Sequence, residues 1–177
     1  MMSIKRQNNF LNLYEPIHDK FDRFCRARAY GEMDAQDLMN ETLMVAFEKL
    51  DELKSDKAFF SFLCGISIRI LSNAARKKQA SFKDLGAAEN LYDQTSETEK
   101  NFEVEMLHKC LSKLPDIQRE CIILFEISGF SINEIATIQN SSISAIKQRL
   151  KRGRERLEEI LKFEVSYKVE GALWGKV

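Results

Sequence analysis

Turn-forming residues are scarce in this chain. Its 177 residues include 2 prolines and 7 glycines, which argues against β-sandwiches and barrels, because those folds need frequent turns. No apolar run approaches the roughly 20 residues that a membrane span needs, and no apolar segment follows the basic N-terminal residues as it would in a signal peptide. We therefore expect a cytoplasmic protein with no membrane insertion.

Residues that usually hold metals or perform catalysis are also few. The 4 cysteines and 2 histidines form no C-x-x-C or H-E-x-x-H pattern, and His108 and Cys110 alone are too few ligands for a metal site. The chain has no phosphate-binding P-loop and no nucleophile elbow. We expect no metal, no cofactor and no enzymatic activity, and we interpret the cysteines as small buried apolar residues.

What the chain has in abundance is helix-forming residues at helical spacing. Two helical stretches, residues 10–80 and 103–162, flank residues 81–102, which lose this spacing and gain Ser, Thr, Gln and acids. Residues 163–177 follow as a tail. The prediction is an all-α protein with two small helical domains joined by a flexible linker, the second domain containing a helix-turn-helix.

The first stretch predicts three helices. Glu15-Pro16 suits a helix start and Gly31 a helix end, while Asp34 caps a second helix that runs to about Leu50. The second helix should bury Leu38, Met39, Leu43, Ala46, Phe47 and Leu50 and expose Asp37, Asn40, Glu41, Met44 and Glu48. The third should end near Lys78 and bury Phe59, Phe62, Leu63, Ile66 and Ile70.

The net charge of zero hides segregated charges. Residues 66–83 carry basic side chains and no acid, whereas residues 84–105 are strongly acidic. On the third helix, Arg69, Ser72 and Arg76 share a stripe with Asn73 beside it. Blocks of opposite sign indicate separate faces for separate partners, although an ordinary solvated helix face would explain this stripe equally well.

The second stretch contains the sequence SINEIATIQNSSISAIKQRLKRGRERL, residues 131–157. Ser131 and Glu134 form a capping box, residues 140–142 form a turn, and Ser142 caps a second helix that runs to about Leu161. A short helix, a tight turn and a longer helix with polar and basic residues on its outer side are typical of a helix-turn-helix that enters the major groove of DNA. The alternative is an amphipathic helix with a basic surface.

These stretches resemble a known family. The sequence LPDIQRECIILFEISGFSINEIATIQNSSISAIKQRLKRGRERL resembles region 4 of sigma-70-type RNA polymerase sigma factors. DAQDLMNETLMVAFEKL and FFSFLCGISIRILSNAARKKQ resemble the start and the later part of region 2. The two-region layout is similar to that of the extracytoplasmic-function (ECF) group.

The resemblance implies a subunit that binds core RNA polymerase, brings it to specific promoters and helps to open them. Region 2 would dock on the clamp helices of the largest polymerase subunit, the polymerase flap would be a second contact, and an anti-sigma factor would be a further partner. The residues implied for core binding are Asp37, Leu38, Asn40 and Glu41. Those implied for the −10 element are Asp51, Lys54, Ser55, Lys57, Arg69, Ser72, Asn73 and Arg76. Those implied for the −35 element are Ser142, Ser144, Lys147, Gln148, Arg149, Lys151 and Arg152.

The chain departs from the family pattern at the turn and within the helix that follows it. Gln139 stands where leucine is usual, Asn140 where glycine is common, and Gly153 where alanine is usual. Asparagine tolerates a left-handed backbone, whereas glycine within a helix costs about 1 kcal/mol.

Two other functions fit parts of the sequence. A helix-turn-helix regulator that binds DNA without polymerase would need a ligand pocket or a dimerisation helix in the first stretch. A helical adaptor would leave the basic helix unexplained.

Overall fold

The computed structural model describes residues 4–84 and 102–174, and the side chains of residues 4–80 and 102–164. The described residues fall into two compact units, one on each side of the gap. All regular elements in these residues are helical, so the all-α prediction is confirmed. Most of the predicted flexible linker, together with its acidic cluster, lies outside the described residues.

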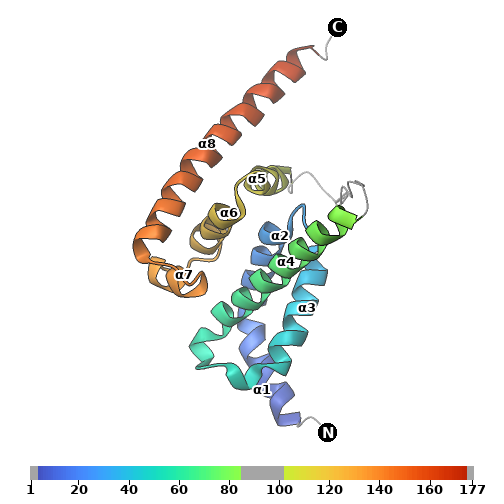
Figure 1. Ribbon diagram of the computed structural model, residues 1–177, viewed down its shortest axis with the longest axis vertical. Helices are drawn as coiled ribbons and strands as arrows, with labels where there is room; N and C mark the ends of the chain where they lie inside the picture. Colours follow the sequence, from blue (N-terminus) through green and yellow to red (C-terminus); the bar gives the residue numbers. More distant parts are fainter. Residues whose placement is uncertain (1–3, 85–101, 175–177) are drawn as a thin grey trace. The chain divides into compact units, whose positions relative to one another are not determined.

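Unit 1 contains four α-helices (Figure 1). They are α1 (Ile4–Tyr14), α2 (His18–Ala29), α3 (Ala35–Glu48) and α4 (Phe59–Asp84), with short 3-10 turns η1 (Glu15–Ile17), η2 (Leu50–Glu52) and η3 (Asp56–Ala58). Helix α1 was not predicted from the sequence. Helix α4 runs beyond the predicted end near Lys78, into the expected linker.

Local signals explain most of these boundaries. Pro16 lies in η1, where the chain passes from α1 to α2, because a ring that fixes φ and removes a donor fits a first helical turn. Gly31 follows α2 with φ +78°, a value that favours glycine. Asp34 caps α3 by accepting hydrogen bonds from the amides of Gln36 and Asp37 at 2.8 and 3.0 Å.

The core of unit 1 lies where α2, α3 and α4 pack together. Phe21, Phe24, Leu38 and Leu63 are fully buried there. The buried face of α4 is rotated from the prediction, since Phe62 and Ile70 are only half-buried. Phe60, Cys64, Ser67 and Leu71 are buried in addition to Phe59, Leu63 and Ile66. The predicted stripe missed this face because it left out Phe60 and Leu71, and because Ser67 is a polar residue that is buried through its hydrogen bonds to Thr42 and to the Leu63 carbonyl.

One helix of the described chain is long and apolar enough to cross a membrane by length and composition alone. It covers Asp56–Ala80, with a mean hydropathy of 1.5 over its most apolar window. Buried helices of water-soluble domains meet the same criterion, and Phe59, Leu63 and Leu71 of this helix are buried inside unit 1.

Unit 2 contains α5 (Phe102–Ser112), α6 (Asp116–Ile122), a π-helical turn η5 (Ile123–Ile127), α7 (Ile132–Ile138) and α8 (Ile143–Trp174) (Figure 1). Gly129, with φ +70°, follows η5 and ends this helical run. The core combines Leu111, Ile123, Leu124, Ile135 and Ile146, all at most 1% exposed.

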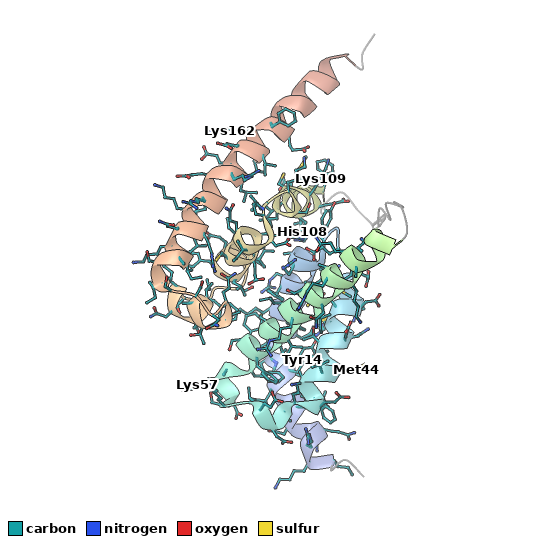
Figure 2. All side chains as sticks on the ribbon, in the orientation of Figure 1. Tyr14, Met44, Lys57, His108, Lys109 and Lys162 are labelled. Carbon is teal, nitrogen blue, oxygen red and sulfur yellow. The ribbon has the colours of Figure 1, made fainter. Side chains whose placement is uncertain are left out.

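Helix α8 is longer than predicted: it continues through Trp174 rather than ending near Leu161. Two ion pairs fasten it to α5 and to the residue that follows α5: the Glu164 carboxylate lies 3.7 Å from Lys109 Nζ and also accepts a hydrogen bond from Lys113. The hydrogen bond from Lys113 is the main cause that lowers the pKa of Glu164. Figure 2 labels Lys109 on α5 and Lys162 on α8, two residues before Glu164 in the sequence. The predicted tail is therefore mostly a continuation of the second helix of the helix-turn-helix.

Candidate nucleic-acid interface

The predicted helix-turn-helix is present as α7 and α8. At the start of α7, Ser131 Oγ accepts from the Glu134 amide at 3.3 Å, and Glu134 Oε2 accepts from the Ser131 amide at 2.8 Å. This reciprocal pair is the predicted capping box. It fixes where α7 begins, and so where the turn that follows must lie.

The turn between the two helices depends on Asn140. Its φ is +45°, in the left-handed region, which asparagine tolerates better than most residues. Ser142 then caps α8, because its Oγ accepts from the amide of Ala145 at 3.2 Å. The structure therefore confirms that asparagine can replace the usual glycine here and that α8 begins with its N-terminal turn capped.

The outer side of α8 carries most of the residues expected to contact DNA. Ile146 and Leu150 point inward and are at most 3% exposed, which turns the intervening positions outward. The exposed polar and basic residues of this side are Ser142, Ser144, Lys147, Gln148, Lys151 and Arg152. Of these, Lys151 makes one loose ion pair within the helix, 3.9 Å from Glu155. This row of side chains lies on the side of α8 that faces away from Ile146, Leu150 and the core.

Arg149 differs from the rest of the expected −35 residues. Its side chain is half-buried, and its Nη1 donates to Gln139 Oε1 at 2.8 Å. Gln139 in turn donates to Glu120 Oε1 of α6 at 2.6 Å and accepts from Cys121 Sγ at 3.1 Å. The structure thus gives Arg149 a role inside the domain that its position in the sequence did not reveal.

On unit 1, the expected −10 residues form two exposed groups. Asp51, Lys54, Ser55 and Lys57 lie in the segment between α3 and α4, and Lys57 is labelled in Figure 2. The other group, Arg69, Ser72, Asn73 and Arg76, lies on α4, where Arg76 donates to the Ser72 carbonyl and to Asn73 Oδ1 at 3.3 and 2.8 Å. At about 1.5 Å per helical residue, about 15 Å of α4 separates its first residue from Arg69, so the two groups suit successive parts of one extended ligand.

The exposed face of α3 is acidic. Asp37, Asn40 and Glu41 are exposed as predicted, and Met44 on the same helix is 68% exposed (Figure 2). Leu38, in contrast, is fully buried, because it lies about 100° around the helix from Asp37 and faces the core. The expected contact between Leu38 and a partner is wrong for this structure, and Met44 is the apolar side chain available on this face.

Comparison with known proteins identifies the family. Residues 104–157 match the family model of sigma-70, region 4. Over 129 residues the chain is 32% identical to the ECF RNA polymerase sigma factor EcfG of Rhodopseudomonas palustris, an alignment covering 72% of this chain and 71% of that protein. The chain belongs to the ECF RNA polymerase sigma factors. Sigma factors bind RNA polymerase and direct promoter-specific transcription, and a regulator acting without polymerase is not favoured.

Other relatives of this sigma factor cover more of its length. It is 25% identical over 169 residues to the ECF RNA polymerase sigma factor SigW of Bacillus subtilis, across 88% of this chain and 90% of that one. Among solved structures it is similar to the sigma factor RpoE in complex with the anti-sigma factor NepR from Bartonella quintana. That likeness has a TM-score of 0.78 and 27% identity, over 87% of this chain and 97% of that one. CnrH in complex with the cytosolic domain of CnrY gives a TM-score of 0.65 and 25% identity, over 88% and 89%.

The cysteines of this sigma factor are buried and free, as the sequence predicted. Burial raises the pKa of Cys25 to about 12 and that of Cys121 to about 11, so both thiols stay protonated at neutral pH. Among the described residues, no group of three or more His, Cys, Asp and Glu side chains is placed to hold a metal ion.

Three residues to which the sequence analysis gave no functional role bear on these surfaces. Met44 is exposed within the acidic face of α3, Gln139 links α6 to α8, and Arg6 of α1 contacts the segment that follows α3. Gln139 had one signal, since leucine is usual at its position. Arg6 had none, because its partners lie more than 40 residues away in sequence.

Proposed function

We propose that this sigma factor works in the cytoplasm by gripping core RNA polymerase through α3, holding the −10 element with unit 1 and reading the −35 element with α8. The observation that carries the proposal is the one-sided row on α8, from Ser142 to Arg152, presented by a correctly capped helix-turn-helix.

The −35 role follows from the chemistry of that row. Lys147, Lys151 and Arg152 can neutralise phosphates, and Ser144 and Gln148 can hydrogen-bond to base edges. Ser142 lies at the helix N-terminus, where its hydroxyl already caps the helix. We assign Arg149 to holding α8 in place through Gln139, rather than to a direct contact with DNA.

The −10 role rests on the two exposed groups of unit 1. Lys54 and Lys57 lie in a segment with exposed backbone turns, and Arg69 and Arg76 follow along α4 with Ser72 and Asn73 beside them. Basic groups that follow a single strand give a salt-dependent affinity, and capture of an unstacked base offsets the cost of extruding it. Strand capture would help to open the promoter.

The core-binding role rests on charge and exposure. Asp37 and Glu41 lie one turn apart on the exposed side of α3, with Asn40 between them and Met44 one turn on. An acidic face with an apolar side chain beside it complements a basic coiled coil, which in core polymerase would be the clamp helices of the largest subunit. Unit 2 would meet the flap of the polymerase.

An anti-sigma factor is the remaining proposed partner. A sigma factor of similar structure was solved in complex with an anti-sigma factor, and a partner that covers the α3 face or the α8 row would keep this one inactive. The sigma factor itself contributes binding and not catalysis, because the chemistry of RNA synthesis belongs to the core enzyme.

The core-binding proposal is tested by charge reversal. A double variant Asp37→Lys and Glu41→Lys should fail to co-elute with sigma-free core polymerase on a sizing column. A matched double reversal, Glu155→Lys and Glu159→Lys, has the same i, i+4 spacing on exposed positions of α8 and should co-elute as the wild type does. Equal co-elution of both variants would remove the docking role of α3.

The promoter-binding proposal is tested by run-off transcription on a library of genomic fragments. Core polymerase with the sigma factor should transcribe a restricted set, and core polymerase alone should not. Tight and specific binding of these fragments by the sigma factor without polymerase would instead support a regulator that acts alone.

A further inference from the structure

We infer that Arg6 of α1 is a positioning residue for promoter opening, because it fixes the segment of residues 49–58 that is proposed to hold the −10 strand. The inference rests on the proposed function. It adds α1 to the apparatus, although the likeness to region 2 begins only after this helix in the sequence.

Arg6 connects α1 to the end of α3 and to the segment beyond it. Its Nη2 donates to the carbonyls of Phe47 and Glu48 at 2.9 and 3.1 Å. Its Nη1 lies 3.2 Å from Asp51 Oδ2, and its guanidinium lies over the Phe47 ring, 5.6 Å from the ring centroid. One side chain therefore holds both the last turn of α3 and the first turn of the segment.

The aromatic packing of α1 supports the same point. Phe10 is 7% exposed and meets the rings of Phe47 and Phe59 edge-on, with centroids 5.4 Å apart in each case. Phe47 is near the end of α3 and Phe59 begins α4. Helix α1 thus contacts the chain at both ends of the segment between α3 and α4. Arg6 adds hydrogen bonds and an ion pair at the α3 end.

The chemistry of these contacts suits an arginine. The last carbonyls of a helix lack partners within the helix and carry partial negative charge, and a guanidinium can donate to them and to a carboxylate at the same time because it presents five N–H donors in a fixed fork. The segment carries three acidic side chains, Asp51, Glu52 and Asp56. The Arg6 guanidinium offsets the charge of Asp51, and Lys49 pairs with Glu52 at 3.1 Å, which lowers the repulsion that these carboxylates would exert on DNA phosphates. A lysine could keep the charge but not all three contacts.

Apart from Arg6, the contacts within the segment are local ones: the Lys49–Glu52 ion pair at 3.1 Å and the backbone hydrogen bonds of its short turns. Within it, η2 and η3 are single 3-10 turns, and Leu50, at 8% exposed, is its one buried side chain. Lys54, Ser55 and Lys57 are exposed. A strand-binding surface gains affinity when it is held in its binding conformation beforehand, so loss of Arg6 should weaken strand capture without touching DNA directly.

The test compares Arg6→Ala and Arg6→Lys with the wild type in the reconstituted holoenzyme, on promoter fragments first selected by run-off transcription with the wild type. Opening is measured by permanganate reactivity of unpaired thymines. The control is Arg26→Ala, which removes an exposed arginine of unit 1 whose Nε lies 2.8 Å from Asp22 Oδ2 of the same helix. Co-elution with core and protection of the upstream promoter DNA are measured in parallel.

We expect Arg6→Ala to reduce open-complex formation about tenfold, the size of effect that one charge-assisted contact set can produce, and Arg6→Lys to fall between it and the wild type. Arg26→Ala should open promoters as the wild type does. Core binding and upstream protection should persist in all three variants. A template with an unpaired −10 bubble should restore most of the transcription, because strand separation no longer depends on capture.

Several results would overturn the inference. One is that Arg6→Ala opens promoters as well as the wild type does, and another is that Arg26→Ala loses as much open-complex formation as Arg6→Ala does. A third is that Arg6→Ala also loses core binding, because that would show that Arg6 serves only the stability of unit 1. A wild-type holoenzyme that opens no promoter would overturn the proposed function and the inference with it, whereas wild-type opening that Arg6→Ala leaves intact would overturn the inference alone.

Discussion

Arg149 and Gln139 are joined by a 2.8 Å hydrogen bond from Nη1 to Oε1, which ties α8 to the turn that precedes it. Because Gln139 also binds Glu120 and Cys121 of α6, three parts of unit 2 meet at one amide. In this sigma factor a polar side chain connects the turn to its neighbours where leucine packing is usual, and it pairs with an arginine of α8.

Arg149 and Lys147 should therefore separate stability from DNA binding. We expect Arg149→Ala to lower the free energy of unfolding by about 1–3 kcal/mol, since a half-buried charge-assisted hydrogen bond is lost. Lys147→Ala should leave stability within about 0.5 kcal/mol and weaken promoter binding while reducing the salt dependence by about one ion. Urea unfolding and holoenzyme binding at several salt concentrations measure the two effects. Equal stability of the two variants would contradict the role of Arg149.

The buried pair Thr42 and Ser67 makes a second prediction. Ser67 Oγ donates its single hydrogen to the Leu63 carbonyl at 3.0 Å, so Thr42 Oγ1 is the donor in its 3.0 Å contact with Ser67. Ser67→Ala should cost about 1–3 kcal/mol, because it strands the buried Thr42 hydroxyl, whereas Thr42→Val should cost about 1 kcal/mol or less. In a double-mutant cycle by urea unfolding, the double variant should be more stable than the sum of the single costs implies. Additive costs would show that the two hydroxyls act independently.

Gly153 gives a third prediction. A Cβ at this position would lie 3.1 and 3.2 Å from Cδ1 and Cγ1 of Ile122. Gly153→Ala should be nearly neutral, because about 1 kcal/mol of helix propensity is gained while Ile122 must shift by a few tenths of an ångström. Gly153→Leu should cost about 1–3 kcal/mol through overpacking. Arg156→Leu, at an exposed position of the same helix, is the control, and a Gly153→Leu variant as stable as this control would show that α6 and α8 do not need the glycine.

The cysteines give a fourth prediction. With a pKa of about 11, Cys121 is about one part in a thousand thiolate at pH 8, so iodoacetamide should leave it and the other buried cysteines unmodified in the native protein and label all four in urea. A Ser144→Cys variant, exposed on α8, should react readily and so controls for the reagent. Rapid native labelling of Cys121 would show that unit 2 opens locally.

The same pKa shifts set a pH dependence. In the folded state the thiol pKa of Cys25 is about 12 and that of Cys121 is about 11. In the unfolded chain both thiols lose their protons near their ordinary pKa of 9.0. Their contribution to stability is therefore complete below pH 9 and is lost as the pH rises from there toward 11 and 12. The urea midpoint should decline over this window.

Short-range signals predicted much of this structure. Asp34 and the Ser131–Glu134 pair fixed helix starts because caps act within three residues, and Asn140 was predicted to tolerate the left-handed turn that it adopts. The alternation of Ile146 and Leu150 with polar neighbours correctly placed the outer row of α8. These features depend on neighbours along the chain, which a sequence displays directly.

Long-range contacts were beyond the sequence. Spacing places Arg149 on the rim of α8 but does not say that its flexible side chain folds back to Gln139. Helix α1 buries only Phe10, so its apolar spacing is too weak to predict a helix there. Its proposed role depends on contacts with α3 and the segment after it, which are distant in sequence. Leu38 fitted both the buried face and the motif for core binding, and packing against α2 and α4 decided between them.

The length of α8 has a practical consequence. Its 32 residues form one uninterrupted helix, about 48 Å from end to end. Ser144 lies in its first turn, and Glu164, which pairs with Lys109 and Lys113, lies two-thirds of the way along. A helix without a break has no hinge, so a probe attached beyond Glu164 would report the tilt of the N-terminal end of α8 from a distance. A spin label there could follow the sigma factor onto its promoter without disturbing a single base contact.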